Sequence, residues 1–330
     1  MSGQGTPRDV VARVPLGRRG MTVTRIGMGT APIGGLFSSV GDAAAEATFA
    51  AAWAGGVRYF DTAPHYGVGT AERRLGAFLA GLDPAARAEA VVSTKVGRLL
   101  EPGRTEPGTE SFHEGASLVR RRDYTREGVY RSLADSLERS GLDAFDIALI
   151  HDPDDHWPEA VWEAYPALER LRDEGAVRAI GVGMNQTAMP ARFVTETDID
   201  CVMVAGRYSL LDRGAEEELL PLCAERGVGV LVAAVFNSGV LADPRPGAHY
   251  DYAPAPATVL RRARWMADRC TAHGVSLAAA ALRFPLRHPA VTGVVVGART
   301  PTEITDDLAL AATDIPADLW AELDQEARGR

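Results

Sequence analysis

Short runs of β-branched and other apolar residues alternate with longer stretches of helical periodicity between about residues 25 and 310. This alternation is typical of βα units arranged around a parallel sheet. About eight such runs occur, which favours a closed barrel over an open doubly wound sheet. The predicted strands lie at residues 25–29, 57–60, 90–95, 147–151, 177–183, 201–205, 228–234 and 291–296.

The predicted fold is an α/β TIM (β/α)8 barrel, a single domain with extended βα loops. Its helices are expected on the outside, as the helical spacing of Val129, Leu133 and Leu137 indicates. The chain has 330 residues, which is within the range of barrels that carry insertions. Residues 1–20 are rich in Arg and Gly and are interpreted as a flexible N-terminal lead-in, which leaves residues 21–330 as the barrel.

Two segments interrupt the regular alternation, namely residues 97–123 after the third strand and residues 237–256 after the seventh. Both are rich in Gly, Pro and charged residues, and in a barrel both leave the C-terminal face, where sites form. We predict that they are substrate-gating loops. Surface insertions without a role in binding are the alternative.

Composition excludes several classes of partner. The net charge of -9 and the pI of about 5.4 argue against a nucleic-acid partner. No apolar stretch reaches the roughly 18 to 20 residues of a membrane helix. The three cysteines form no C-x-x-C pair, so neither a disulfide framework nor a metal site is predicted, and a reducing, cytoplasmic location is expected. The oligomeric state is left open.

Polar, titratable side chains stand at the ends of several predicted strands. Asp61 follows VRYF, Lys95 ends AVVSTK, His151 follows IALI and Asn185 follows AIGVGM. The C-terminal ends of barrel strands share one mouth, so these groups are expected to converge.

Lys95 needs a partner because an unpaired ammonium after a buried strand is costly, and Asp61 can supply the carboxylate. An ion pair that only closes the barrel is the alternative. Tyr66 lies five residues after Asp61 in FDTAPHYG. A neighbouring ammonium favours the phenolate, so we expect the pKa of Tyr66 to fall toward working pH, as a general acid-base requires.

These motifs resemble those of the aldo-keto reductases, and the resemblance covers nearly the whole chain. FDTAPHYG, STKVG and LIHDP carry Asp61, Tyr66, Lys95 and His151 in the order of that family's catalytic tetrad. The resemblance implies that hydride passes between C4 of a nicotinamide and the substrate carbon. Tyr66 then exchanges a proton with the substrate oxygen, and His151 orients the carbonyl.

The resemblance also implies an extended dinucleotide across the barrel mouth, bound without a Rossmann turn, and the G-x-G-x-x-G pattern fails here at both Gly27 and Gly67. GVGMNQ resembles the carboxamide-binding motif, with Asn185 retained, whereas the family's glutamine falls on Ala205. The pyrophosphate loop resembles the segment of Phe236, Asn237, Ser238 and Gly239. A plain turn around Gly239 is the alternative.

The segment VVVGARTPTEITDD is similar to the family's adenosine-binding region. Gly297 and Glu303 replace the Lys and Arg that hold the 2'-phosphate in NADP-preferring relatives. A carboxylate repels a phosphate but accepts a hydrogen bond from a free 2'-hydroxyl, which favours NAD. Arg299 could still bind a 2'-phosphate, so NADP remains an alternative cofactor. Asp307 stands where many relatives carry the Asn that contacts the adenine.

DTAPHYGVGTAERRLG and KVGRLL resemble the aldose dehydrogenase branch, which includes L-fucose, D-threo-aldose and pyridoxal dehydrogenases. This implies oxidation of a cyclic hemiacetal to a lactone with NAD or NADP, in the L-fucose or D-threo-aldose class. His65, Asp154 and His156 are then expected to meet sugar hydroxyls. Ordinary solvated loop positions are the alternative for all three.

Three other functions remain open. An NADPH-dependent reductase of an aldehyde or ketone, for instance in secondary metabolism, would use the same four residues. A non-catalytic nicotinamide-binding regulator would not need them intact. A metal-dependent hydrolase would need clustered ligands, for which HDPDDH is the one candidate, and no metal ligands are predicted.

Overall fold

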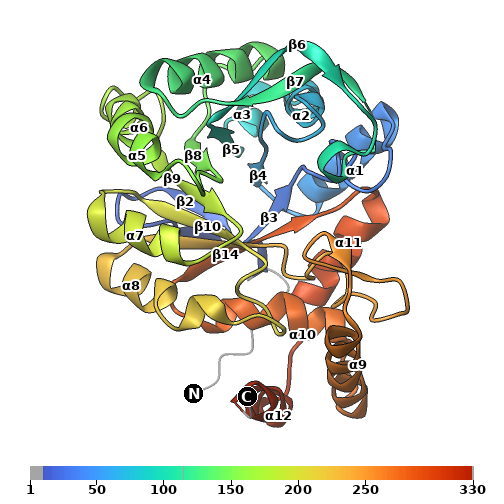
Figure 1. The fold of residues 1–330 in the computed structure, drawn as a ribbon. Coiled ribbons are helices and arrows are strands. Elements are labelled where there is room, and N and C mark those ends of the chain that lie inside the picture. The colour runs from blue at the N-terminus through green and yellow to red at the C-terminus, as the bar shows by residue number, and fades with distance from the viewer. Residues whose placement is uncertain (1–9, 114, 329–330) are drawn as a thin grey trace.

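Eight parallel strands form a closed barrel in the computed structural model, which describes residues 10–113 and 115–328 (Figure 1). The strands follow one another around the barrel in chain order, which confirms the predicted fold and every predicted strand to within a few residues. They are β3 (Ile26–Gly29), β4 (Tyr59–Asp61), β5 (Val91–Val96), β8 (Ile147–His151), β9 (Ala179–Met184), β10 (Cys201–Ala205), β11 (Gly229–Ala233) and β14 (Val291–Gly297).

Helices surround the barrel, and their ends are set by local sequence. In α4, the Thr125 hydroxyl accepts a hydrogen bond from Gly128 N, and Gly141 ends the helix with a φ of 66°. The helices are α1 (Asp42–Ala54), α2 (Thr70–Ala80), α3 (Pro84–Arg87), α4 (Arg126–Ser140), α5 (Trp157–Glu159), α6 (Tyr165–Asp173), α7 (Ala188–Glu196), α8 (Leu219–Arg226), α9 (Ala257–Ala272), α10 (Leu277–Arg283), α11 (Pro301–Ala311) and α12 (Ala317–Arg328). Shorter helical turns are η2 (Thr109–Ser111), η3 (Ala160–Ala164), η4 (Gly214–Glu216) and η5 (Phe284–Arg287).

The barrel interior is filled by side chains from strands that are buried on both faces. Tyr59 lies fully inside, and its ring occupies the place where a Cβ on Gly27 would come within 2.4 Å. A side chain at position 27 would therefore displace the Tyr59 ring. Tyr59 belongs to an interior cluster of apolar side chains that also contains Val91, Ile147, Leu149 and Leu231.

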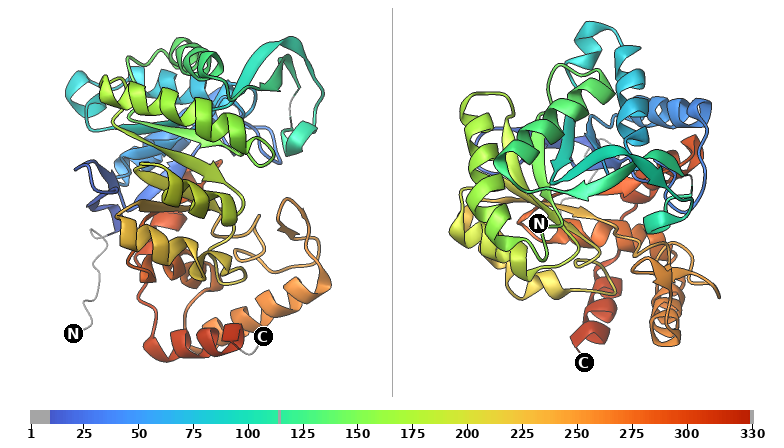
Figure 2. Two further views of the ribbon diagram at one scale, coloured as in Figure 1. Left: turned by 60° about the vertical axis from the view of Figure 1, so that its left-hand side comes forward. Right: turned by 45° about the horizontal axis from the view of Figure 1, so that its top comes forward.

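A short N-terminal hairpin closes the bottom of the barrel. Strand β1 (Arg13–Pro15) pairs antiparallel with β2 (Thr22–Thr24), and Leu16, Met21 and Val23 pack into the interior cluster. Residues 10–20, which the sequence analysis placed in a lead-in, are thus part of the packed structure, and residues 1–9 lie outside the described part. Figure 2 (left) shows these N-terminal strands on the side opposite to the long loops.

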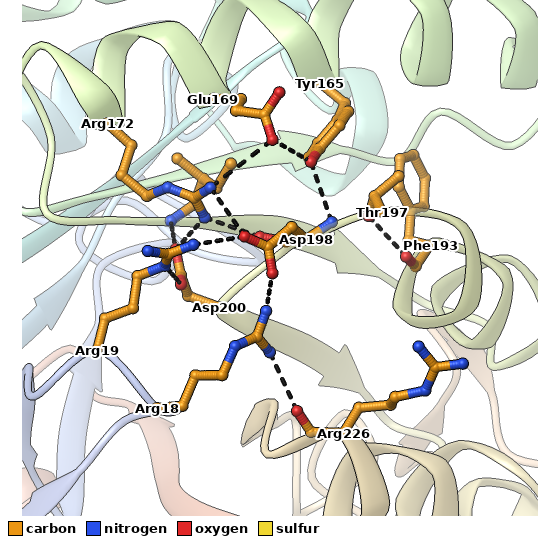
Figure 3. Close-up of polar contacts among 11 residues, drawn as sticks. Arg18, Arg19, Tyr165, Glu169, Arg172, Phe193, Thr197, Asp198, Asp200 and Arg226 are labelled. Carbon is orange, nitrogen blue, oxygen red and sulfur yellow. Dashed lines mark hydrogen bonds and ion pairs between the residues drawn. The ribbon is translucent and has the colours of Figure 1, made fainter.

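Charged side chains fix this hairpin to the barrel (Figure 3). Arg18 and Arg19 both pair with Asp198, and Arg19 Nε lies 2.9 Å from Asp200 Oδ1. Asp200 is buried and also accepts hydrogen bonds of 2.9 Å from Arg172 Nη1 and from Ile180 N. The carboxylate therefore joins the hairpin to the start of β9 and to the end of α6.

Replacing Asp200 with asparagine is expected to lower the free energy of unfolding by about 2 kcal/mol, because charge-assisted hydrogen bonds to Arg19 and Arg172 are weakened. The urea midpoint measures the change. Replacing Arg170 with glutamine breaks an exposed pair with Glu174 and should change stability by less than about 0.5 kcal/mol. Equal effects of the two changes would contradict the assigned role of Asp200.

Both segments predicted as irregular gating loops contain strands. Residues 97–123 form a long hairpin of β6 (Arg98–Thr105) and β7 (Ala116–Arg122), and the second segment contains β12 (His249–Tyr250) and β13 (Ala253–Pro254). The tip of the first hairpin is tied to the loop after β3 by Phe37 N to Ser111 O, 2.8 Å, and His113 N to Gly35 O, 2.9 Å. Both segments extend from the same end of the barrel in Figure 2 (left). Among the described helices, none combines the length and apolar character needed to cross a bilayer.

Candidate active site

Three of the four predicted catalytic residues stand at the C-terminal ends of adjacent strands. Asp61 ends β4, Lys95 lies near the end of β5 and His151 ends β8. Lys95 Nζ lies 2.6 Å and 2.8 Å from the Asp61 carboxylate oxygens and 3.0 Å from the Tyr66 hydroxyl. The ring of His151 lies 6.0 Å from that of Tyr66. The structure therefore brings the four residues together at the mouth of the barrel.

Tyr66 is carried by a turn after β4 that packs tightly against the loop after β3. Gly67 has a φ of 60°, and a Cβ there would lie 2.2 Å from Gly34 O. A Cβ on Gly34 would lie 2.7 Å from the Tyr66 carbonyl carbon. Two glycines facing each other thus allow the backbone contact that holds the phenol over Lys95.

A chain of hydrogen bonds connects the barrel interior to Lys95. The Tyr59 hydroxyl lies 3.0 Å from Ser93 Oγ, which donates to Asp61 Oδ1 at 2.7 Å. Burial acts to lower the pKa of Lys95, but the attraction of Asp61 and Tyr66 and their hydrogen bonds outweigh it, so that pKa is raised. Lys95 is therefore a fixed ammonium at neutral pH.

The expectation of a lowered pKa for Tyr66 is wrong for this structure. Burial raises the pKa of Tyr66 to about 12, and Asp61 adds to this effect, whereas Lys95 lowers the pKa without compensating for both. The neighbouring cation favours the phenolate, but the loss of water around the buried phenol has the larger effect. Tyr66 is thus a protonated hydrogen-bond donor at neutral pH.

His151 is held as a neutral imidazole. Burial lowers the pKa of His151 well below its usual value, and Arg98 and Lys95 lower it further. The hydroxyl of Tyr124 donates to the carbonyl oxygens of His151 and Asp152 at 2.6 Å and 2.8 Å. The backbone that carries the imidazole is therefore anchored beside the phenol.

Sequence reasoning missed a second charged group at the mouth. Arg98, the first residue of β6, bonds to Asp152 Oδ2 at 2.6 Å and to His65 Nδ1 at 3.1 Å. Arg120 on β7 donates to His65 O at 2.9 Å, and Glu110 lies 3.4 Å from His65 Nδ1. A signal was present, since Arg98 follows Lys95 by three residues and Asp152 follows His151 directly.

Of the three predicted substrate residues, only His65 lies beside Tyr66 and His151. Asp154 and His156 instead contact other residues of the protein. The His65 ring is 5.9 Å from the Tyr66 ring and 5.6 Å from the His151 ring. Asp154 accepts a hydrogen bond of 2.6 Å from Gln186, and His156 packs on Tyr124 at 5.1 Å. Contacts with sugar hydroxyls remain predictions for all three.

The loop after β11 has a backbone suited to phosphate. Asn237, Ser238 and Gly239 have φ values of 45°, 61° and 106° in succession, and successive amides in such turns form anion-binding concavities. The Asn237 side chain is occupied, because it accepts from Ser209 Oγ at 2.5 Å and donates to Gly206 O at 3.1 Å. Phe236 packs against the core, and binding of a pyrophosphate by this loop remains a prediction.

Asn185 lies exposed beyond β9, where an amide can face a nicotinamide carboxamide. Arg207, two residues beyond Ala205, donates to Asn185 O at 2.7 Å. The same guanidinium pairs with Asp251 at 2.7 Å. Arg207 thus links the carboxamide motif to the loop of residues 237–256, a connection that the sequence did not reveal.

At the predicted adenosine end, Glu303 already has a partner. Its carboxylate accepts from Arg299 N at 2.7 Å and pairs with Arg299 Nη2 at 3.1 Å. Thr300 caps α11 by accepting from Glu303 N at 3.1 Å. A Cβ on Gly297 would lie 2.8 Å from Pro32, so a lysine there would require the loop after β3 to move. Glu303 therefore partly neutralises the charge of Arg299, and the contact of either residue with a cofactor remains a prediction.

Asp307 is buried on α11 near two other carboxylates. Burial raises the pKa of Asp307 to about 7, and Glu303 and Asp306 contribute. In the unfolded chain the pKa lies near 3.8. Folding is therefore opposed increasingly as the pH rises from about 4 to 7, and the full penalty applies above that range.

Replacing Asp307 with asparagine is expected to raise the free energy of unfolding at pH 8 by about 2 kcal/mol. The pKa difference corresponds to about 4 kcal/mol, and about half is lost because a buried amide still needs partners. Urea unfolding at several pH values measures the gain, which should vanish near pH 4. A gain that persists at pH 4, or one matched by the exposed control Asp306→Asn, would contradict the explanation.

Within residues 10–113 and 115–328, no group of three or more His, Cys, Asp or Glu side chains is arranged to hold a metal ion. In HDPDDH, Asp152 pairs with Arg98 and Asp154 with Gln186. The three cysteines are buried and unpaired.

Comparison with known proteins shows which family the chain resembles. The sequence profile of the Aldo/keto reductase family matches residues 25–328. The chain is 45% identical to D-threo-aldose 1-dehydrogenase of a Pseudomonas species, covering 94% of this chain and 95% of the relative. It is 41% identical to pyridoxal 4-dehydrogenase of Microbacterium luteolum, covering 94% and 96%. An aldo-keto reductase structure from Bacillus halodurans shares the fold with a TM-score of 0.77 at 24% identity over 96% of each chain. The chain therefore belongs to the aldo/keto reductase family.

Proposed function

We propose that this NAD(P)-dependent oxidoreductase oxidises the cyclic hemiacetal of an aldose to a lactone. The observation that carries the proposal is the contact of Lys95 Nζ with both the Asp61 carboxylate and the Tyr66 hydroxyl. This geometry places a phenol beside a fixed cation, as proton exchange with a substrate oxygen requires. The relatives named for D-threo-aldose and pyridoxal support a sugar or a related carbonyl compound as substrate.

The described residues fit a nicotinamide dinucleotide laid across the mouth. We propose that Asn185 holds the carboxamide, that the main chain at residues 236–239 holds the pyrophosphate, and that Gly297, Arg299, Glu303 and Asp307 face the adenosine. A bound nicotinamide would supply the hydride acceptor for oxidation of the sugar carbon and the hydride donor for the reverse reaction. Tyr66 accepts the hydroxyl proton as a phenolate in oxidation and returns it as a phenol in reduction. His151 orients the oxygen through a neutral imidazole nitrogen.

The raised pKa of Tyr66 gives the two directions opposite pH dependences. Oxidation needs the phenolate. At pH values below the pKa of about 12, the phenolate population rises about tenfold with each unit increase in pH. Reduction needs the phenol, which is the dominant form at neutral pH. Oxidation is therefore expected to accelerate in alkaline buffer, and assays of sugar oxidation should be run at pH values up to about 9.

We propose NAD as the preferred cofactor because Glu303 repels a 2'-phosphate and neutralises Arg299. Replacing Glu303 with glutamine should raise the ratio of kcat/KM with NADP to that with NAD about tenfold, which corresponds to about 1.4 kcal/mol. Glutamine keeps the acceptor that Arg299 N uses. The matched charge change Asp318→Asn on α12 serves as control. An unchanged ratio in the Glu303 variant would contradict the role of its charge.

The proposal is tested by absorbance at 340 nm with NAD or NADP and a panel of L-fucose, D-arabinose, other aldoses, pyridoxal and simple alcohols. Formation of NADH with one or more aldoses, together with the lactone, is the expected result. Consumption of NADPH with aldehydes or ketones, and silence with sugars, would overturn the proposal in favour of a carbonyl reductase. Cofactor binding without turnover of any compound would indicate a regulator.

A further inference from the structure

The contacts of Arg98 determine which nitrogen of His65 carries its proton. Arg98 Nη1 lies 3.1 Å from His65 Nδ1, and Arg98 Nη2 donates to Asp152 Oδ2 at 2.6 Å. A guanidinium has five N–H donors and no acceptor. The contact with His65 is therefore a hydrogen bond only if Nδ1 supplies a lone pair. A neutral His65 then carries its proton on Nε2.

The surrounding charges keep His65 in this neutral form. Burial lowers the pKa of His65 to about 2, and four nearby cations contribute, namely Arg98, Arg120, Lys95 and Arg122. Among the residues that the structure describes, Glu110 is the one carboxylate paired with the His65 ring, with Oε2 3.4 Å from Nδ1. It also faces Arg98 at 3.8 Å and Arg120 at 3.3 Å, so its charge is shared with two cations. A proton on Nδ1 is thus disfavoured as long as Arg98 is present.

The other nitrogen of His65 is left for a ligand. Within the described part of the chain, Nε2 makes no hydrogen bond, and the side chain keeps 14% of its surface exposed. The ring is fixed between Phe112 at 5.2 Å, His151 at 5.6 Å and Tyr66 at 5.9 Å. His65 is therefore a rigid donor next to the two groups that address the reacting oxygen.

We propose that Arg98 is a positioning residue that holds neutral His65 in its Nε2–H form, and that His65 donates to the C2 hydroxyl oxygen of the aldose. The second half of this inference rests on the proposed function. The C2 oxygen is the nearest hydroxyl oxygen to the reacting C1 oxygen that Tyr66 and His151 address. A largely buried donor loses water when a substrate binds, so it discriminates against a substrate that lacks the matching oxygen. His65 thus selects sugars that carry an oxygen at C2.

The tautomer is tested directly, without activity, by two-dimensional ¹⁵N–¹H NMR of the full chain labelled at histidine nitrogens. The His65→Gln variant assigns the His65 signals. We expect a pyridine-type shift at Nδ1 and a pyrrole-type shift at Nε2, unchanged down to about pH 5. In Arg98→Met, protonation should appear at least about one pH unit higher. Arg98→Lys, which keeps a donor and a charge, should restore the wild-type pattern, and the exposed control Arg104→Gln should not alter it.

Substrate selection is tested with D-arabinose and 2-deoxy-D-ribose, which differ only in the C2 oxygen, or with L-fucose and its 2-deoxy analogue. The wild type should prefer the parent sugar by about tenfold or more in kcat/KM, and His65→Phe should abolish the preference. His65→Gln, which offers an amide donor, should retain part of it. A preference that survives in His65→Phe would overturn the assignment of the C2 oxygen.

The two tests fail in different ways. A proton on Nδ1 in the wild type would overturn the role of Arg98, whatever the enzyme oxidises. The predicted tautomer together with no turnover of any aldose would overturn the proposed function and, with it, the C2 assignment, while the role of Arg98 would stand. An unchanged tautomer and pH response in a folded Arg98→Met variant would also overturn the positioning role.

Discussion

Replacing Tyr66 with phenylalanine is expected to lower kcat about a thousandfold, because the phenol is the group placed to exchange a proton with the substrate. The hydroxyl bonds to Lys95 Nζ at 3.0 Å, and removing it leaves the Lys95–Asp61 pair intact. The dissociation constant of NAD or NADP should change by less than about threefold, because the phenol acts in the transition state. Steady-state kinetics and cofactor fluorescence titration measure the two quantities.

Tyr130→Phe provides a matched control, because this tyrosine lies on α4, outside the barrel mouth. It should retain wild-type turnover. Near-normal kcat in Tyr66→Phe would refute the role of the phenol. A large loss of cofactor affinity in that variant would show instead that the hydroxyl is needed for binding.

Replacing Lys95 with methionine is expected to destabilise the fold by about 3 to 5 kcal/mol. The change leaves the Asp61 carboxylate buried without its cation, and breaking a buried pair by removing one partner has this effect. Turnover should also fall, because the charge of Lys95 and its hydrogen bond both lower the pKa of Tyr66 and both are lost in the variant. Urea unfolding and kinetics on folded protein measure the two losses separately.

The double variant Lys95→Met with Asp61→Asn separates stability from chemistry. The asparagine oxygen can still accept from Ser93 Oγ, and no charge is left buried. Much of the lost stability should return while turnover stays low. Recovery of turnover in the double variant would contradict a chemical role for Lys95, and failure to recover stability would contradict the buried-charge explanation.

The barrel, and the convergence of polar side chains at its mouth, could be predicted because they depend on local patterns. Each barrel strand is a short apolar run, and the polar residue that ends it, such as Asp61 or His151, faces the mouth because all strands are parallel. The order of the residues in the chain therefore implied their meeting in space. The extent to which each side chain is buried is harder to predict from the sequence. For this reason the shift in the pKa of Tyr66 was predicted in the wrong direction.

Features that depend on long-range pairing could not be predicted. The hairpin of β6 and β7 has Pro102 and Gly103 within its first strand and a charged second strand, so its sequence is typical of a loop. The sequence places Arg98 close after Lys95, but its contacts with His65 and Asp152 depend on how the hairpin folds over the mouth. Leu16 likewise could not be assigned from its local sequence, because it packs in one cluster with residues as distant in the chain as Leu231.

The hairpin of β6 and β7 has an evolutionary consequence. The hairpin is inserted in the chain between β5 and α4, and its two strands form hydrogen bonds chiefly with each other. Its tip is held by a few main-chain hydrogen bonds to the loop after β3. Its length and sequence can therefore change without disturbing the register of the barrel. A change of sequence in this hairpin would therefore alter contacts at the mouth, such as that of Arg98 with His65, while the parallel pairing of the barrel strands is kept.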